Sequence, residues 1–244
     1  MTETDIAIAD YCRRHGLSHW RPEAALIDMD GVLYDSMPGH AHAWKRMMEE
    51  EGVPCTEEEF FLYEGMTGKA TIEMLMRERM GRVLSPEEIK RLYARKTEYF
   101  KAQGPRKTMP GADRMLRILI EAGIIRVLVT GSGQPSLLTS LEHEYPGAFL
   151  PGNRVTALDV QKGKPDPEPY LMGLQKAGCD ATKAIVIENA PLGVEAGHAS
   201  GCFTVGLTTG PVPRKSLEDA GADLTVASMP EFADLLPQLL RGNV

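Results

Sequence analysis

Short apolar runs alternate with helical segments through the second half of the chain. The runs at 124–130, 184–187 and 203–207 read IIRVLVT, AIVI and FTVGL, and an earlier run at 24–27 reads AALI. Runs of this length between helices are typical of strands buried on both faces, because helices cover both sides of a parallel sheet. The pattern therefore predicts a three-layer α/β core built around a parallel sheet.

The segment 36–109 has a different pattern. Its apolar side chains recur every three or four positions, as in TIEMLM at 71–76, and no convincing strand appears in it. We expect this segment to be an all-helical cap domain inserted into a core formed by residues 1–35 and 110–244. Residues 1–21 are expected to form an N-terminal helical extension of that core.

Composition narrows the class of protein. The 244 residues are 43% hydrophobic and 25% charged, as in an ordinary globular protein, and the net charge of −7 argues against a nucleic-acid partner. The four cysteines are scattered, so a disulfide framework or a zinc site is not expected. The N-terminus lacks the basic start of a signal peptide, and no stretch approaches the ~20 apolar residues of a membrane span. We expect a cytoplasmic monomer that binds neither nucleic acid nor membranes.

Two aspartates follow the first apolar run directly. Asp28 and Asp30 stand one residue apart, and Gly31 comes next. Neighbouring carboxylates repel each other, which destabilises a fold unless a cation or a reaction uses them. A divalent metal such as Mg²⁺ takes oxygen ligands, and one aspartate can be a nucleophile while the other transfers protons. The alternative is a polar turn that only ends the strand.

Small and hydroxyl residues follow the run at 124–130. Thr130, Ser132 and Gln134 lie in TGSGQ, where exposed backbone N–H groups and hydroxyls suit a phosphoryl oxygen. A dinucleotide fingerprint is weak here, because Ser136 occupies its third glycine position. A plain loop between strand and helix is the other alternative.

Three more polar positions follow the same logic. Lys164 lies in the proline-rich KGKPDPEPY and could neutralise a phosphoryl group, although a lysine in a loop is commonly just solvated. Glu188 and Asn189 follow AIVI and could close a metal site, although Asn189 could equally cap the next helix. The carboxyl ends of parallel strands meet at one edge of a sheet, so these residues should lie near the two aspartates.

One lysine of the inserted segment lies on an apolar stripe. Lys96 stands four residues from both Leu92 and Phe100 on the last predicted cap helix. Either its ammonium group reaches solvent along the apolar surface, or it points into the cleft between cap and core. The sequence GMTGKAT at 65–71 is no P-loop, because the first glycine and the final serine or threonine of that pattern are missing.

Together these segments resemble the four motifs of the haloacid dehalogenase-like hydrolases. DMDGVLYDS, VLVTGSGQ, KGKPDPEPY and VIENAPLGVEAG stand in the order and at the positions of those motifs. The resemblance covers nearly the whole chain after residue 22 and is closest to the β-phosphoglucomutase-like branch, which implies a Rossmann-like core with a helical cap inserted after the first motif. YEGMTG and IENAPLGVEAGH further resemble a Bacteroides-type phosphatase subgroup that includes an inorganic pyrophosphatase.

The resemblance implies a mechanism. Asp28 would attack phosphorus and form an aspartyl-phosphate, and Asp30 would protonate the leaving oxygen and then activate water. Thr130 and Lys164 would hold the phosphoryl oxygens, with Ser132 and Gln134 as further substrate contacts from the same loop. Mg²⁺ would bind the Asp28 carboxylate, the Asp30 carbonyl and the side chain at position 189. Phosphoryl transfer of this kind depends mainly on positioning and charge neutralisation.

Two departures from the branch bear on the substrate. Glu188-Asn189 replaces a Glu-Asp pair, and we expect Glu64 of the cap loop to supply the missing carboxylate to the metal when the cap closes. The mutases carry a basic residue at the position of Glu64 and an arginine at the position of Gly68, and that arginine grips the distal phosphate of a sugar bisphosphate. In this chain Lys69 is adjacent to the arginine position. His40, however, matches a histidine that assists the acid/base group of the mutase.

These features favour hydrolysis of a small phosphorylated substrate. Inorganic pyrophosphate is the leading candidate, and a sugar phosphate is the other. Two alternatives belong to functional classes other than hydrolases. One is a β-phosphoglucomutase, which is an isomerase, and the other is a binding protein without catalytic activity.

Overall fold

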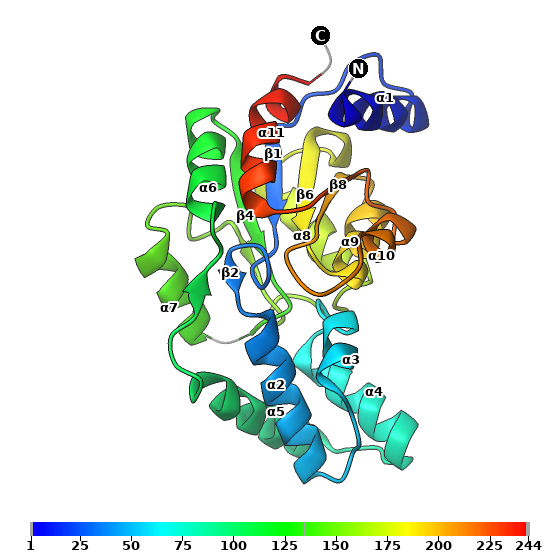
Figure 1. Ribbon diagram of the computed structural model, residues 1–244, viewed down its shortest axis with the longest axis vertical. Coiled ribbons are helices and arrows are strands. Elements are labelled where there is room, and N and C mark those ends of the chain that lie inside the picture. Colours follow the sequence, from blue (N-terminus) through cyan, green and yellow to red (C-terminus); the bar gives the residue numbers. More distant parts are fainter. Residues whose placement is uncertain (1, 134, 243–244) are drawn as a thin grey trace.

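The computed structural model of the protein describes residues 2–133 and 135–242 and has a six-stranded parallel sheet at its centre (Figure 1). The strand order is β5-β4-β1-β6-β7-β8, and every neighbouring pair is parallel. The predicted three-layer α/β core is therefore confirmed. The strands are β1 (Ala24–Ile27), β4 (Ile125–Val129), β5 (Arg154–Val155), β6 (Ala184–Glu188), β7 (Phe203–Leu207) and β8 (Leu224–Val226).

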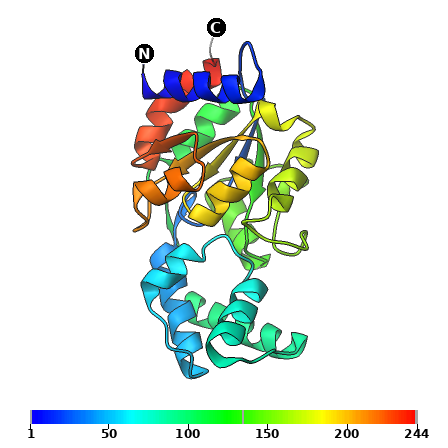
Figure 2. The ribbon, with the colours of Figure 1, turned by 90° about the vertical axis from the view of Figure 1, so that its right-hand side faces the viewer.

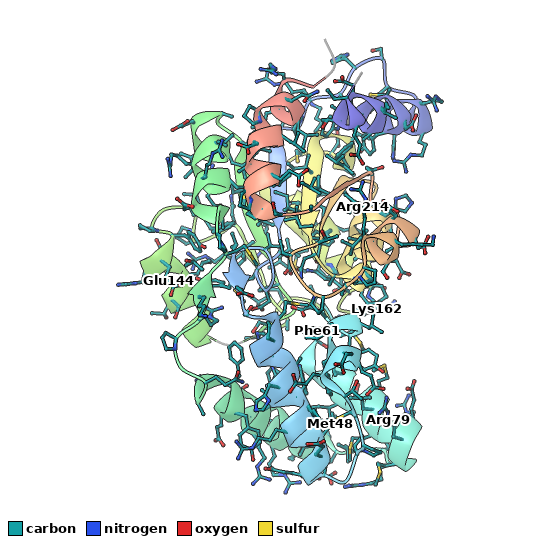
Figure 3. The ribbon with its side chains drawn as sticks, in the orientation of Figure 1. Met48, Phe61, Arg79, Glu144, Lys162 and Arg214 are labelled. Atoms are coloured by element: carbon teal, nitrogen blue, oxygen red, sulfur yellow. The ribbon has the colours of Figure 1, made fainter. Side chains whose placement is uncertain are left out.

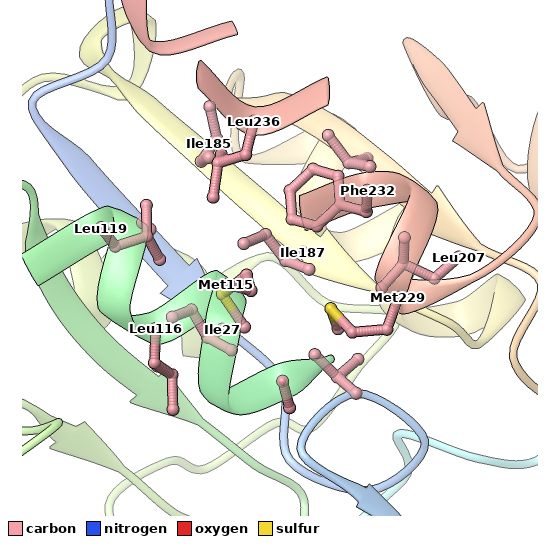
Figure 4. Packing of buried hydrophobic residues seen from close by; sticks show 14 of the residues in the cluster. Ile27, Met115, Leu116, Leu119, Ile185, Ile187, Leu207, Met229, Phe232 and Leu236 are labelled. Atoms are coloured by element: carbon pink, nitrogen blue, oxygen red, sulfur yellow. The ribbon is translucent and has the colours of Figure 1, made fainter. Parts of the chain in front are cut away.

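Alternate residues of each strand serve two separate apolar layers. In β1, Ala25 and Ile27 face the layer that contains α6 (Ala112–Glu121) and α11 (Met229–Arg241), and Figure 4 shows Ile27 beside Met115 of α6 in this layer. Leu26 faces the opposite layer with residues of α8 and α9. This alternation follows from the two-residue period of a strand, and it explains why the apolar runs are continuous. The remaining core helices are α7 (Pro135–Glu144), α8 (Glu168–Ala177), α9 (Pro191–Ala199) and α10 (Arg214–Asp219).

Four helices between β2 and β3 form a separate layer beyond the strand ends, in the lower half of Figures 1 and 2. They are α2 (Met37–Glu50), α3 (Glu57–Leu62), α4 (Gly68–Met80) and α5 (Pro86–Lys101). The layer has its own apolar cluster, which includes Phe60, Leu75 and Leu92. Ser85 caps α5 through its hydroxyl, which accepts a hydrogen bond from the backbone nitrogen of Glu88.

The ends of this helical segment differ from the prediction. Tyr34–Asp35 (β2) and Lys107–Thr108 (β3) pair as a two-stranded antiparallel ribbon, so the segment 36–109 is not wholly helical. A strand of two residues is too short to produce an alternating pattern in the sequence. The ribbon forms because the backbones of β2 and β3 pair with each other. The short run VTAL at 155–158 also indicates a strand, but β5 ends at Val155. Asp159 accepts hydrogen bonds from the backbone nitrogen and the hydroxyl of Thr156, and the chain turns there.

The N-terminal extension is helical, as expected, and α1 spans Glu3–His15. Tyr11 and Trp20 pack on Phe203 of β7, with the Trp20 and Phe203 ring centroids 4.6 Å apart. Both chain ends lie at the side of the core opposite the helical layer (Figure 1). In the described part of the chain, no helix is both long and apolar enough to cross a membrane.

Candidate active site

The strand ends bring the predicted polar residues together. Ile27 of β1 lies in register with Leu128 of β4 and Ile187 of β6, so the residues that follow these strands share one edge of the sheet. Asp28 and Thr130 line a cavity there of about 70 Å³, which the helical layer closes from the other side. The core residues that line the cavity are Asp28, Asp30, Thr130, Gly131 and Ser132. Its other lining residues are His40, Trp44, Phe60, Tyr63, Glu64, Gly65, Met66, Gly68, Thr71, Tyr93 and Lys96.

Lys164 is buried between two carboxylates. Its Nζ atom lies 2.5 Å from Oδ1 of Asp28 and 2.6 Å from Oε1 of Glu188. Burial alone would lower the pKa of Lys164, but the charges of both carboxylates outweigh burial and raise the pKa above its ordinary value. Burial also raises the pKa of Asp28, while Lys164 opposes this shift and Glu188 adds to it. The lysine offsets only part of the effect of burial, and the pKa of Asp28 is raised to about 8.

Both carboxylate oxygens of Glu188 have protein partners. Oε1 accepts hydrogen bonds from Lys164 and from the Tyr170 hydroxyl at 2.8 Å. Oε2 accepts from the backbone nitrogens of Asn189 and Ala190, at 2.9 and 3.1 Å. Glu188 thereby fixes both the ammonium group beside Asp28 and the turn that carries Asn189.

Asn189 has a buried oxygen without a partner. Its Oδ1 atom has no hydrogen-bond partner in the described structure, while Nδ2 points to the sulfur of Met37 at 3.5 Å. A Cβ atom at Gly31 would collide with this side chain, so the glycine leaves room for it beside the Asp28–Asp30 turn. An unpaired buried carbonyl oxygen is costly, and a cation is the partner that such an oxygen fits.

Asp30 has two hydrogen-bond donors from the start of the helical segment. Its Oδ1 accepts from Ser36 Oγ at 2.6 Å and lies 3.2 Å from His40 Nε2. Burial would raise the pKa of Asp30, but the His40 charge and both hydrogen bonds outweigh it, and the pKa is below its ordinary value. Asp30 is thus ionised in this arrangement.

Lys96 points into the cavity rather than to solvent. Its Nζ atom lies 2.5 Å from His40 Nδ1, and the side chain is 2% exposed, with Trp44 and Phe100 as aromatic neighbours. Burial lowers the pKa of Lys96 to about 8, although Asp30 and Glu64 oppose the shift. Burial and the nearby lysine also lower the pKa of His40.

Glu64 is half-buried and lines the cavity from the side of the helical layer. Burial raises its pKa well above the ordinary value, and the negative charges of Asp30 and Asp28 raise it further. Three carboxyl groups therefore face the same small volume. The described His, Cys, Asp and Glu side chains nevertheless form no cluster of three that could hold a metal ion by themselves.

The loop after β4 contributes hydroxyl groups. The Thr130 hydroxyl accepts a hydrogen bond from the backbone nitrogen of Ser132 at 3.1 Å. Ser132 Oγ is buried, and the described residues offer it no partner. Gln134, the remaining predicted substrate contact, lies outside the described residues.

Sequence reasoning missed two residues that position the carboxylates. Ser36 donates to Asp30, and Tyr170 donates to Glu188. Each is the last residue of a quoted motif, DMDGVLYDS or KGKPDPEPY, so proximity in the sequence was a signal. Serine and tyrosine are also common at such positions without a functional role. Only the contacts in the structure show that these two side chains position carboxylates.

Comparison with known proteins agrees with this geometry. Residues 22–201 match the haloacid dehalogenase-like hydrolase family. Hexitol phosphatase A of Escherichia coli (strain K12) is 31% identical over 187 residues, which cover 76% of this chain and 82% of that protein. A phosphorylated carbohydrates phosphatase of Thermotoga maritima is 28% identical over 223 residues, which cover 89% of this chain and all of that protein.

A solved structure is more similar still. A candidate β-phosphoglucomutase from Bacteroides vulgatus superimposes with a TM-score of 0.93 at 43% identity, over 98% of this chain and 97% of that one. The chain belongs to the haloacid dehalogenase-like hydrolase family. The family resemblance inferred from the four sequence motifs is therefore confirmed.

Proposed function

We propose that the protein is a Mg²⁺-dependent phosphohydrolase that acts on a small phosphorylated substrate, with inorganic pyrophosphate as the leading candidate. The observation that carries this proposal is the cavity lined by Asp28 and Asp30, with the buried Lys164 ion-paired to Asp28. We also propose that residues 36–109 are the cap domain and residues 1–35 and 110–244 the core, since the cavity lies between these two groups of residues.

Asn189 supports the metal assignment. Its unpaired Oδ1 atom, the Asp28 carboxylate and the main-chain carbonyl of Asp30 would supply an all-oxygen set of the kind that Mg²⁺ prefers, and Glu64, which lines the cavity, is a further candidate ligand. The cation would neutralise phosphoryl oxygens and favour the ionised form of Asp28. We assign Glu188 the task of positioning Lys164 instead of direct ligation, because protein donors already bind both of its oxygens.

The chain's own residues account for the two chemical steps. An oxygen of Asp28 attacks phosphorus and forms an aspartyl-phosphate, while the bond to the leaving oxygen breaks and that oxygen takes a proton from Asp30. Asp30 then takes a proton from water, whose oxygen attacks the same phosphorus and releases phosphate and free Asp28. Thr130 and Lys164 hold the non-bridging oxygens in both steps.

Asp30 must carry a proton for the first step. His40 and Ser36 keep it ionised in the described arrangement, which suits the second step. A phosphate group beside Asp30 adds negative charge and raises its pKa, because like charges disfavour ionisation. We infer that substrate binding itself makes Asp30 a proton donor.

The cavity favours a compact substrate. Its volume of about 70 Å³ leaves little room beyond the transferred group, and aromatic side chains such as Trp44 and Tyr93 form its cap wall. Pyrophosphate has a small leaving group, whereas a sugar phosphate would need a wider opening of the cap. The names of the phosphatase relatives support sugar phosphates as the second candidate.

A phosphate-release screen tests the proposal. Purified protein should release phosphate from pyrophosphate or a hexose phosphate with Mg²⁺ and lose this activity with excess chelator. Asp28→Asn should abolish release without unfolding the protein, as circular dichroism would verify. If no member of a broad panel releases phosphate at any metal concentration, the proposal fails.

β-Phosphoglucomutase activity is the second candidate function. The similarity to the Bacteroides vulgatus protein and the contact between His40 and Asp30 favour it. Incubation with β-glucose 1-phosphate and a trace of the bisphosphate separates the two functions, because only a mutase forms glucose 6-phosphate. The acidic side chain of Glu64 in the cavity argues for hydrolysis, since it should repel the second phosphate of a sugar bisphosphate.

The role of Glu64 has its own test. Glu64→Gln keeps the size of the side chain and removes its charge, so the Mg²⁺ concentration needed for half-maximal activity should rise and turnover should fall. Glu57→Gln, on an exposed face of α3, is the matched control. Unchanged turnover and unchanged Mg²⁺ dependence in Glu64→Gln would exclude the metal role.

A further inference from the structure

The loop that carries Glu64 lies against glycines of the core. A Cβ atom at Gly163 would lie 2.8 Å from Cγ2 of Thr67 and 3.1 Å from its backbone nitrogen. A Cβ atom at Gly131 would lie 2.9 Å from the carbonyl oxygen of Gly65 and 3.0 Å from that of Met66. The first distance at each position is shorter than real Cβ atoms tolerate, so any side chain there would push the cap loop away.

The backbone dihedral angles do not require glycine at either position. Gly131 and Gly163 lie outside the left-handed region that favours glycine, so alanine could adopt both conformations. Gly65 is different, because its φ is 92° and a Cβ atom there would lie 3.1 Å from Cδ of Lys164. The need for glycine at positions 131 and 163 is therefore explained by the close packing of the loop at 65–67 on them.

An apolar contact joins cap and core nearby. Phe61 of α3 packs on a core cluster of Val194, Val212 and Leu217. Figure 3 labels Phe61 and Lys162, which lie close to the junction of the two parts. The cap loop and α3 are thus held at separate points on the core surface.

We propose that Gly131 and Gly163 are positioning residues that accept the cap loop and so hold the cap closed with Glu64 beside Asp28 and Asp30. Gly163 receives Thr67, and Gly131 receives the carbonyl groups of Gly65 and Met66. This inference rests on the proposed function for its catalytic consequence, but the closed arrangement itself can be measured without substrate.

Gly163→Ala is the direct test. Overpacking of a close contact should shift the closed-to-open ratio toward the open form by about ten- to hundredfold. Trp44 lines the cavity and Trp20 is buried in the core, and these are the only two tryptophans of the chain. Acrylamide quenching of tryptophan fluorescence should therefore increase in the variant, and small-angle X-ray scattering should show a larger radius of gyration.

Two further variants separate cap closure from local damage. Gly152→Ala is the matched control, because a Cβ atom there meets no described atom within 4 Å, and it should match the wild type. Thr67→Ser removes the methyl group that the new side chain at position 163 would meet, and it keeps the hydroxyl that accepts from the Ala70 nitrogen. Thr67→Ser combined with Gly163→Ala should recover most of the lost closure.

The outcomes are distinguishable. The proposal is overturned if Gly163→Ala shows the same quenching and scattering as the wild type. It is also overturned if adding Thr67→Ser does not reverse the increased quenching of Gly163→Ala, because the increase would then come from displacement of Lys164. Phe61→Ala, which weakens the separate apolar contact, should also increase quenching of Trp44. If the wild type releases no phosphate from any substrate, the proposed function fails while the fluorescence result still decides the role of Gly163.

Discussion

Replacement of Lys164 by methionine is the sharpest test of how the site is held together. The lysine side chain is 1% exposed and lies within 2.6 Å of both Asp28 and Glu188. Methionine keeps most of the apolar length and removes the charge, so two buried carboxylates lose their cation. Breaking a buried ion pair from one side costs about 3–5 kcal/mol, and we expect the free energy of unfolding to fall by that amount near neutral pH.

Lys162, two residues before Lys164, gives a matched control. Its side chain is 73% exposed and pairs with Asp166 at 3.4 Å, so Lys162→Met should cost about 1 kcal/mol or less. Urea denaturation followed by circular dichroism measures both variants. Equal losses in the two variants, or a loss below about 1 kcal/mol in Lys164→Met, would refute the electrostatic account.

The pH dependence of the same variant adds an independent check. Without the lysine, burial and the charge of Glu188 raise the folded-state pKa of Asp28 further above the value of about 8 that it has beside Lys164. The destabilisation from Asp28 is complete above the folded-state pKa of the variant and is relieved as pH falls through that pKa and the carboxyl takes a proton. Lys164→Met should therefore recover stability relative to wild type as pH falls toward about 8, where the wild-type carboxyl begins to take its own proton, and a constant difference above that pH would contradict this reasoning.

Three further predictions concern residues around the site and the extension. Trp20→Ala should lower the free energy of unfolding by about 3–5 kcal/mol in urea titrations, with kcat unchanged, because the ring is buried far from the cavity. Tyr170→Phe removes a hydrogen bond to the Glu188 carboxylate and should cost about 1.5–3 kcal/mol in the same assay. Deprotonation of Lys96, whose pKa is about 8, should raise the KM for an anionic substrate between pH 7 and pH 9, and initial rates of Lys96→Met should lack this rise.

Much of the fold could be predicted because strands and helices bury apolar side chains with different periods. The run AALI marks β1 in full, and the place of Asp28 at its end follows from that boundary. Pairing of β1 with β4 and β6 then brings Thr130 and Glu188 to the same edge. The positions of residues that directly follow a strand can be predicted from the sequence, because regular backbone geometry fixes the edge of the sheet.

Contacts between loops cannot be predicted from the sequence in this way. Lys164 lies in an irregular segment, and its burial between two carboxylates depends on how that loop returns to the sheet. The packing of Thr67 on Gly163 joins residues almost a hundred positions apart, and neither local sequence indicates its partner. The ribbon of β2 and β3 was missed for the same reason, because each strand has only two residues and depends on the other.

That ribbon has a consequence for the architecture of the whole chain. Asp35 lies opposite Lys107, so the polypeptide leaves the core and comes back at a single point. A graft between these two positions would leave the six strands of the parallel sheet in place and would replace Ser36 and His40, which contact Asp30. Joining residue 35 to residue 107 through a short turn should accordingly yield a capless core that still folds, with Asp28 and Asp30 open to solvent.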